Sequence, residues 1–241
     1  MRAWLNLRHP DSARALAFHS GLTRLGYRVE HTLPIRPTAG DIFVTWNRLH
    51  VGNAWAAKFE EEGWPVLVTE NATWGNDFNG GKWLFLGRNR HNTAGMAPYG
   101  GPERWDRLGI ELKPWRKEGE TVILAQRGIG VPPTRMPSGW PEDARRRHGG
   151  RIRHHPGRYA GTPLEADLAR CGKVVTWGSG AAVKAFLMGI PVFSEMPNWI
   201  GGQHNDDESR LAALRRIAWA QFTLEEIASG FAFEVVLDGY T

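Results

Sequence analysis

The 241-residue sequence has few features of secreted or membrane-bound proteins. It contains one cysteine, Cys171, so it cannot form an internal disulfide, and we expect a reducing compartment. No apolar run is long enough for a transmembrane helix. Residues 1–16 lack the apolar core and cleavage site of a signal peptide. We therefore expect a cytoplasmic protein without a membrane anchor.

Short motifs of several common enzyme classes are also missing. The sequence Gly178-Ser179-Gly180 has neither the GxGxxG spacing of a dinucleotide site nor the lysine of a P-loop. There is no HExxH, CxxC or GxSxG motif. The acidic run 206–208 is better explained as the start of a helix than as a cation site. We expect no metal and no tightly bound cofactor.

Basic residues are in modest excess. Lys and Arg number 30 against 25 Asp and Glu, which gives a formal net charge of +5. This excess fits a polyanionic partner, such as nucleic acid or nucleotide phosphate, or merely a basic surface. The basic side chains concentrate between residues 145 and 158. The candidates for nucleic-acid contact there are Arg145, Arg146, Arg147, Arg151 and Arg158.

Strand-like and helix-like segments alternate along the chain. We expect strands at 2–7, 27–30, 41–46, 65–69, 121–125, 151–154, 174–177 and 190–193. We expect helices at 12–25, 53–62, 103–108, 140–147, 163–171, 180–188, 208–221 and 223–230. This alternation predicts an α/β fold with parallel sheets covered by helices. The charged stretch before residue 120 suggests two domains, 1–117 and 118–241.

Residues 70–101 break the alternation. This stretch is rich in Gly and Asn, with one apolar island at 83–86, and it follows the carboxyl end of an expected strand. Long irregular segments in such positions are often functional. Its candidates for proton transfer are Glu70, Asp77 and His91. Each also has a structural explanation, as a turn cap, a solvated Asx turn or a packed histidine.

The stretch 151–195 holds the strongest signal for ligand binding. A β-branched strand turns through Gly178-Ser179-Gly180 directly into a helix, which favours an anion site. Other expected strands of the same half also end in polar groups, and ligands bind at the carboxyl ends of parallel strands. The residues at these ends are Gln126, Arg127, Arg153, His155, Gly157 and Trp177. A glycine turn of this kind is also common without a ligand.

Three segments of the second half resemble a known family. They are Arg153-His154-His155-Pro156-Gly157, PLEADL and VVTWGSGAAVKAFLMGIPVF. Together they resemble the donor-binding half of GT-B glycosyltransferases, most closely capsule-type sugar transferases and small phage-encoded glycosyltransferase-like proteins. The tail AWAQFTLEEIASG adds to the phage-type likeness. The resemblance covers about residues 121–232.

The resemblance implies two Rossmann-like domains that face each other across a cleft, with C-terminal helices packed over both. Arg153 and His155 would then lie near the donor diphosphate, and residues 178–180 would receive phosphate or ribose. Gln126 and Arg127 would line the cleft. Many GT-B proteins have a ribose-binding glutamate where this chain has Lys184. The implied co-substrate is a nucleotide sugar, most simply a UDP-sugar.

Three functional hypotheses follow from these observations. The first is a glycosyltransferase that modifies a hydroxymethylated pyrimidine in double-stranded phage DNA, in the host cytoplasm. The basic charge and the arginine-rich stretch favour it. The second is a glycosyltransferase of surface or capsular polysaccharide. The third is a non-catalytic nucleic-acid-binding protein of the same fold, which the lysine at position 184 favours.

Overall fold

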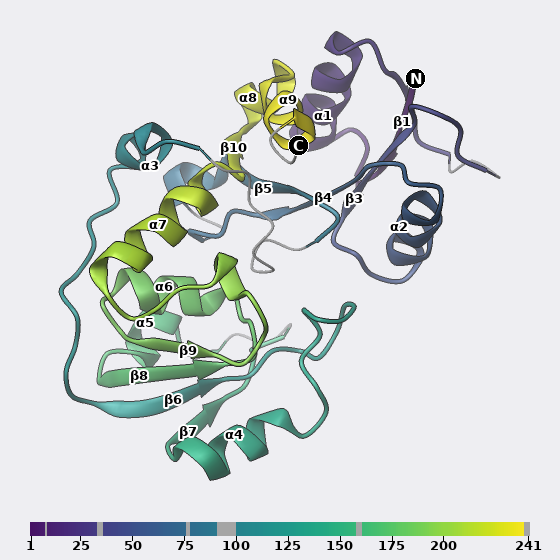
Figure 1. Cartoon of the computed structure of the whole chain (residues 1–241). Coiled ribbons are helices and arrows are strands. Elements are labelled where there is room, and N and C mark those ends of the chain that lie inside the picture. The colour runs from purple at the N-terminus through teal and green to yellow at the C-terminus, as the bar shows by residue number, and fades with distance from the viewer. Residues whose placement is uncertain (8, 33–35, 76–77, 91–99, 158–160, 239–241) are drawn as a thin grey trace. The chain divides into compact units, whose positions relative to one another are not determined.

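A computed structural model of the chain is shown in Figure 1. It describes residues 1–241 except 8, 33–35, 76–77, 91–99, 158–160 and 239–241. The described residues form two compact α/β units, which confirms the predicted fold class. Unit 1 consists of the described residues within 1–104 and 215–241, and unit 2 of those within 105–214. Among the helices described, none is long and apolar enough to cross a bilayer.

Unit 1 is built on a six-stranded sheet. Its strands are β1 (Arg2–Asn6), β2 (Arg28–Glu30), β3 (Ile42–Trp46), β4 (Val66–Asn71), β5 (Trp83–Arg88) and β10 (Gln221–Thr223). They lie in the order β10-β5-β4-β3-β1-β2. Strands β1 to β4 are mutually parallel, whereas β5 is antiparallel to both of its neighbours. The parallel part is the βα series that the sequence predicts.

Helices cover both faces of this sheet. On one face, α1 (Ala13–Arg24) packs with α8 (Leu224–Ala228) and α9 (Phe231–Asp238) (Figure 1), and this face holds the larger hydrophobic core. On the other, α2 (Val51–Glu61) packs against β3 and β4. Side-chain caps begin two of these helices: Ser12 accepts from the N–H of Ala15 at the start of α1, and Thr223 forms a capping box with Glu226 at the start of α8.

A buried carboxylate joins the start of β1 to the segment before β3. Asp41 accepts hydrogen bonds from the Arg2 guanidinium, at 2.9 Å, from the Trp4 indole, at 3.3 Å, and from Thr38. Burial raises the pKa of Asp41, but these hydrogen bonds outweigh it and hold the pKa below its ordinary value. Asp41 is therefore an ionised tie within unit 1.

The chain's last part belongs to unit 1, and here the sequence predictions need correction. The apolar island at 83–86 is not part of an irregular loop but the core of strand β5. The expected helix 208–221 ends earlier, because α7 covers Asp207–Ala218 and residues 221–223 form strand β10 beside β5. The C-terminal residues thus complete the first sheet, whereas the sequence placed them with the second domain.

Arg104, in helix α3 (Glu103–Leu108), fastens this C-terminal segment. Its guanidinium is 3% exposed and pairs with both carboxylate oxygens of Glu226, at 2.8 and 2.9 Å. It also donates to the carbonyl oxygens of Ala218 and Gln221. The guanidinium lies 4.9 Å from the ring centroid of Phe222. A single side chain therefore links α3 to the end of α7, β10 and α8.

Unit 2 contains a four-stranded sheet that is parallel throughout. Its strands are β6 (Glu120–Leu124), β7 (Arg151–Arg153), β8 (Cys171–Thr176) and β9 (Val192–Ser194), in the order β7-β6-β8-β9. Helices α4 (Trp140–His148), α5 (Leu164–Asp167) and α6 (Ala181–Leu187) lie wholly within unit 2, and residues 105–108 of α3 and 207–214 of α7 belong to it as well. The predicted helix 163–171 is shorter than expected because β8 begins at Cys171. Since all four strands are parallel, their carboxyl ends share one edge.

Candidate functional site

The carboxyl edge of the unit 2 sheet collects the residues that the sequence proposes for donor binding. Leu124, the last residue of β6, is in register with Arg153 on one side and with Thr176 on the other. Gln126 and Arg127 follow β6, His155 and Gly157 follow β7, and residues 177–180 follow β8. The strand register therefore brings these segments to one edge, as the sequence predicts.

The Gly-Ser-Gly turn has a well-defined local geometry. The Thr176 hydroxyl donates to the Leu124 carbonyl at 3.1 Å and accepts from the Ser179 N–H at 3.0 Å. The Ser179 hydroxyl in turn accepts from the N–H of Ala181 at 3.2 Å, at the start of α6. A Cβ on Gly178 would lie 2.7 Å from the Met196 sulfur. Close packing therefore explains this glycine without a ligand.

The local contacts of His155 favour a neutral imidazole that can donate a hydrogen bond through Nε2. Its Nδ1 accepts from the N–H of Gly157 at 2.9 Å, so the ring proton is on Nε2. Burial, together with the positive charges of Arg127 and Arg153, lowers the pKa of His155. At neutral pH the imidazole is uncharged and its Nε2–H can donate to an incoming anion.

Arg153 is held in place by a carboxylate from helix α5. Its Nε donates to Asp167, and its Nη2 donates to the Thr162 carbonyl at 3.0 Å. Asp167 also pairs with Arg151, which reaches Glu120 as well. Arg127, by contrast, is exposed and forms no ion pair with any residue that the structure describes. Of Arg127 and Arg153, the two described arginines of the predicted donor site, Arg127 is therefore the more available to a ligand.

Lys184 also has a carboxylate partner. Its ammonium group pairs with Glu165 of α5 at 2.8 Å, and this pairing lowers the pKa of the Glu165 carboxyl. Glu165 is more than half exposed. A carboxylate is thus present beside the position where the family resemblance implies a glutamate, although it comes from a different helix.

Glu195 is an acidic residue of this edge that the sequence analysis missed. It follows β9 and accepts from the Trp140 indole at 2.7 Å, from Arg147 at 2.7 Å and, at 3.2 Å, from the His148 ring. Burial raises the pKa of Glu195, but these bonds outweigh it and hold the pKa below its ordinary value. The sequence signal that could have identified Glu195 is its position just after the expected strand 190–193.

The arginines proposed for nucleic-acid contact are largely engaged within unit 2. Arg146 pairs with Asp143, Arg147 with Glu195, and Arg151 with both Glu120 and Asp167. Arg145 is exposed on α4. Arg158 lies outside the described residues. Because several of these charges are already compensated, the patch presents less positive charge than the sequence suggests.

Of the proton-transfer candidates, Glu70 is described, and Asp77 and His91 lie outside the described residues. Glu70 is half-buried near the carboxyl end of β4 in unit 1. The Asn47 amide nitrogen donates to its carboxylate, while the Asn47 oxygen accepts from the Trp46 indole at 3.2 Å. No group of three or more His, Cys, Asp or Glu residues suited to a metal ion occurs in the described part of the chain.

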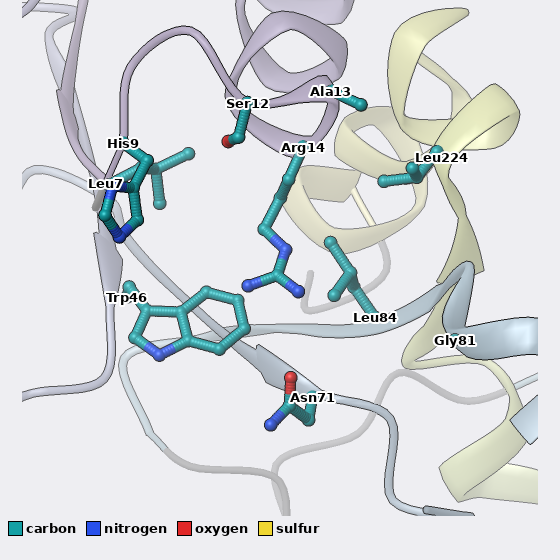
Figure 2. Close-up of a pocket in the computed structure, with 10 residues that line it drawn as sticks. All are labelled: Leu7, His9, Ser12, Ala13, Arg14, Trp46, Asn71, Gly81, Leu84 and Leu224. Carbon is teal, nitrogen blue, oxygen red and sulfur yellow. The ribbon is translucent and has the colours of Figure 1, made fainter. Parts of the chain in front are cut away.

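Unit 1 also contains a cavity of about 540 Å³ that no sequence signal identified. Its polar lining comes from the first βα turn and from the ends of β3 and β4. Figure 2 shows the Arg14 side chain extending from α1 toward the indole of Trp46, with Asn71 on the opposite wall. The rule that ligands bind at carboxyl ends of parallel strands applies to this unit too and could have found it.

Among the solved structures that resemble the chain, two match it over nearly its whole length. One is the beta Kdo 2,4 transferase of Thermosulfurimonas dismutans KpsC, with a TM-score of 0.55 and 13% identity over 92% of both chains. The chain shares its fold with this transferase. The other is the beta Kdo 2,7 transferase of the same KpsC, with a TM-score of 0.53 and 10% identity over 96% of this chain and 98% of that one. No protein-family model and no curated protein sequence matches the chain.

Proposed function

We propose that the protein is a glycosyltransferase that transfers a sugar from a nucleotide-activated donor to a hydroxyl group of a surface or capsular saccharide. The observation that carries this proposal is the end-to-end fold similarity to two Kdo transferases, which spans at least 92% of this chain and of each of those two chains. The cluster of anion-binding groups at the carboxyl edge of unit 2 supports it independently.

The reaction exchanges one bond at the anomeric carbon for another. The bond from this carbon to the donor's phosphate oxygen breaks, and the phosphate leaves with the electron pair. The acceptor oxygen forms the new glycosidic bond and gives up its proton. A protein accelerates such a step by stabilising the charge that develops on the leaving phosphate and by accepting the acceptor's proton.

His155 and Arg127 are our candidates for stabilising the leaving group. The neutral His155 presents its Nε2–H, because Nδ1 is occupied by the Gly157 N–H. Arg127 adds a positive charge that no described carboxylate compensates. Arg153 is a positioning residue: Asp167 orients it, and its charge acts on His155. Such donors do not require a metal ion.

Glu70 is our candidate for the base that accepts the proton of the acceptor hydroxyl. It lies near the carboxyl end of a parallel strand, and the amide of Asn47 orients its carboxylate. A carboxylate held by a hydrogen bond keeps one geometry for proton transfer. Replacing Glu70 by Gln should abolish transfer while leaving donor binding in unit 2 intact.

The contacts within unit 2 favour a saccharide over DNA as acceptor. The arginine-rich stretch that suggested DNA forms ion pairs with Asp143, Glu195, Glu120 and Asp167. The formal net charge of +5 is also modest for a DNA-binding protein of this length. The two solved structures reported above are both described as Kdo transferases.

The decisive experiment is a donor screen. The protein is incubated with uridine, cytidine and guanosine nucleotide sugars and a panel of saccharide acceptors, and released nucleotide is measured. We expect turnover with one donor class, and the panel includes the UDP-sugars that the family resemblance implies. His155→Ala should lower turnover by about 100-fold or more, as loss of a transition-state donor does.

The adjacent His154→Ala is the matched control, because His154 is exposed and forms no hydrogen bond or ion pair within the described residues. It should retain nearly full activity. Equal activity of both histidine variants would remove His155 from the site. Absence of turnover with every donor would refute the proposal. Salt-sensitive DNA binding in a gel shift, with transfer only to hydroxymethylated DNA, would reverse the choice of acceptor.

A further inference from the structure

The unit 1 cavity has the size and lining of a small-molecule site. Its volume of about 540 Å³ lies in the range usual for such sites. It opens where β1, β3 and β4 end, and the lining residues that the structure describes belong to unit 1. They are Leu7, His9, Ser12, Ala13, Arg14, Trp46, Asn71, Gly81, Leu84 and Leu224.

Arg14 is the unusual member of this lining. Its guanidinium carbon lies 4.1 Å from the centre of the Trp46 ring, and the side chain is half-buried. Burial lowers the pKa of Arg14, which reflects the cost of holding its charge away from water. Among the described residues, no carboxylate forms an ion pair with it.

The buried arginines Arg48 and Arg104 of unit 1 differ from the half-buried Arg14, because each is paired with a carboxylate. Arg48 pairs with Glu60 at 2.6 Å, and Arg104 pairs with Glu226 at 2.8 Å. A buried charge is costly unless an opposite charge or hydrogen bonds compensate it. The π-face of Trp46 supplies part of that compensation to Arg14. The remaining N–H groups of the guanidinium favour an anion that enters the cavity.

The rest of the lining suits a sugar. Asn71 offers both amide donors and an acceptor. The Ser12 oxygen accepts from the Ala15 N–H at 3.2 Å, which leaves its own proton free to donate. Leu84 and Leu224 provide an apolar wall for the C–H faces of a sugar ring (Figure 2). The described lining therefore combines the Arg14 guanidinium, several hydrogen-bonding groups and an apolar surface.

We propose that this cavity binds an acidic sugar unit of the acceptor saccharide, with the Arg14 guanidinium paired to its carboxylate. The description of the ligand as acceptor rests on the proposed function, whereas the binding of a sugar carboxylate does not. A planar guanidinium matches a carboxylate through two parallel N–H···O bonds. The same cation could also hold a sugar phosphate, so both anions are tested.

Direct binding measurements test the proposal without any donor. The probes are D-glucuronate, D-glucose 6-phosphate and neutral D-glucose. Each is titrated to tens of millimolar while the backbone and indole N–H signals of the isotope-labelled protein are followed by NMR. We expect glucuronate to shift the Trp46 indole signal and glucose to bind at least about tenfold more weakly, because it cannot pair with Arg14.

Arg14→Gln should weaken glucuronate binding about tenfold or more and leave the weak binding of glucose unchanged. Arg14→Lys keeps the charge but loses the planar donor pair, and should bind with intermediate strength. Arg24→Gln is the matched control, because Arg24 is exposed in the last turn of the same helix. It should bind like the unaltered protein. The spectra also report whether each variant is folded.

Glucuronate binding that does not depend on Arg14, or no shift of the Trp46 signal, would overturn the proposal. Tight Arg14-dependent binding of the phosphate alone would overturn the assignment of a carboxylate. If Arg14-dependent binding of glucuronate persists but no donor supports turnover, the proposed function fails and the acidic-sugar site stands. If a donor supports turnover but an Arg14→Gln variant binds glucuronate and uses acidic acceptors as well as the unaltered protein does, the proposed function stands and the acidic-sugar site fails.

Discussion

Loss of the Arg104 side chain should release the C-terminal segment from unit 1. In Arg104→Met, the methionine fills much of the space but cannot pair with Glu226 or donate to the carbonyl oxygens of Ala218 and Gln221. Glu226 is left about three-quarters buried beside an apolar side chain. Breaking a buried ion pair by removing one partner costs about 3–5 kcal/mol.

The expected consequence is a local loss of stability in unit 1. Urea unfolding followed by tryptophan fluorescence should show the unit 1 transition at lower urea, with the unit 2 transition unchanged. Because two units need not unfold together, hydrogen exchange with mass spectrometry is used to locate the effect. Peptides that cover 215–238 and β5 should exchange faster.

Two further variants isolate the ion pair. Glu226→Gln retains an oxygen for the Thr223 cap, so the double variant Arg104→Met/Glu226→Gln should be less destabilised than the sum of the single variants. Arg107→Ala, an exposed change in the same helix, should alter the free energy of unfolding by less than about 0.5 kcal/mol. A cost below about 1 kcal/mol for Arg104→Met would refute this account of the buried pair.

Three further predictions concern other parts of the fold. Asp41→Asn should destabilise unit 1 by about 2 kcal/mol at neutral pH. The pKa of Asp41 is lower in the folded state than in the unfolded state. Its contribution to the free energy of unfolding is therefore present above about pH 4 and is lost as the pH falls through the folded pKa. In the variant, the free energy of unfolding should lack this decrease at acid pH. Gly189 has φ +72°, and a Cβ there would overlap the Pro114 carbonyl oxygen, so Gly189→Ala should cost about 3 kcal/mol or more in urea unfolding. Gly109→Ala, with φ +63° and open space, should cost about 1–2 kcal/mol; equal costs would contradict the overlap. Burial raises the pKa of the Cys171 thiol, so a thiol reagent should label it only upon unfolding, and rapid labelling of the folded protein would show that this cysteine is accessible.

The sequence predicts the alternating part of the fold well because each buried parallel strand is a short apolar run followed by a clear helix signal. Strand β5 was missed because its neighbours in the sequence are rich in Gly and Asn, and its pairing with β4 is antiparallel. Strand β10 is three residues long and directly follows a helix. Its pairing with β5 is a long-range contact that no local pattern encodes.

For the candidate site, too, the sequence predicted what depends on the order of strands and missed what depends on contacts between distant segments. The rule for strand ends led to Arg153, His155 and the glycine turn, because it needs only the order of strands. It could not show that Asp167 neutralises Arg153, since ion pairs depend on how distant segments pack. Arg14 was missed for a related reason: a lone arginine in a first helical turn carries no signal until Trp46 is seen beneath it.

The pairing of β10 with β5 has a consequence for synthesis of the protein on the ribosome. Unit 2 is encoded without interruption between residues 105 and 214, so all of its described strands are available before the chain is complete. The sheet of unit 1 cannot be completed until residues 221–223 leave the ribosome. Until then, the edge of the apolar strand β5 that pairs with β10 is unpaired. Such edges are templates for aggregation. A nascent chain stalled before residue 221 should therefore be more dependent on chaperones than the finished protein.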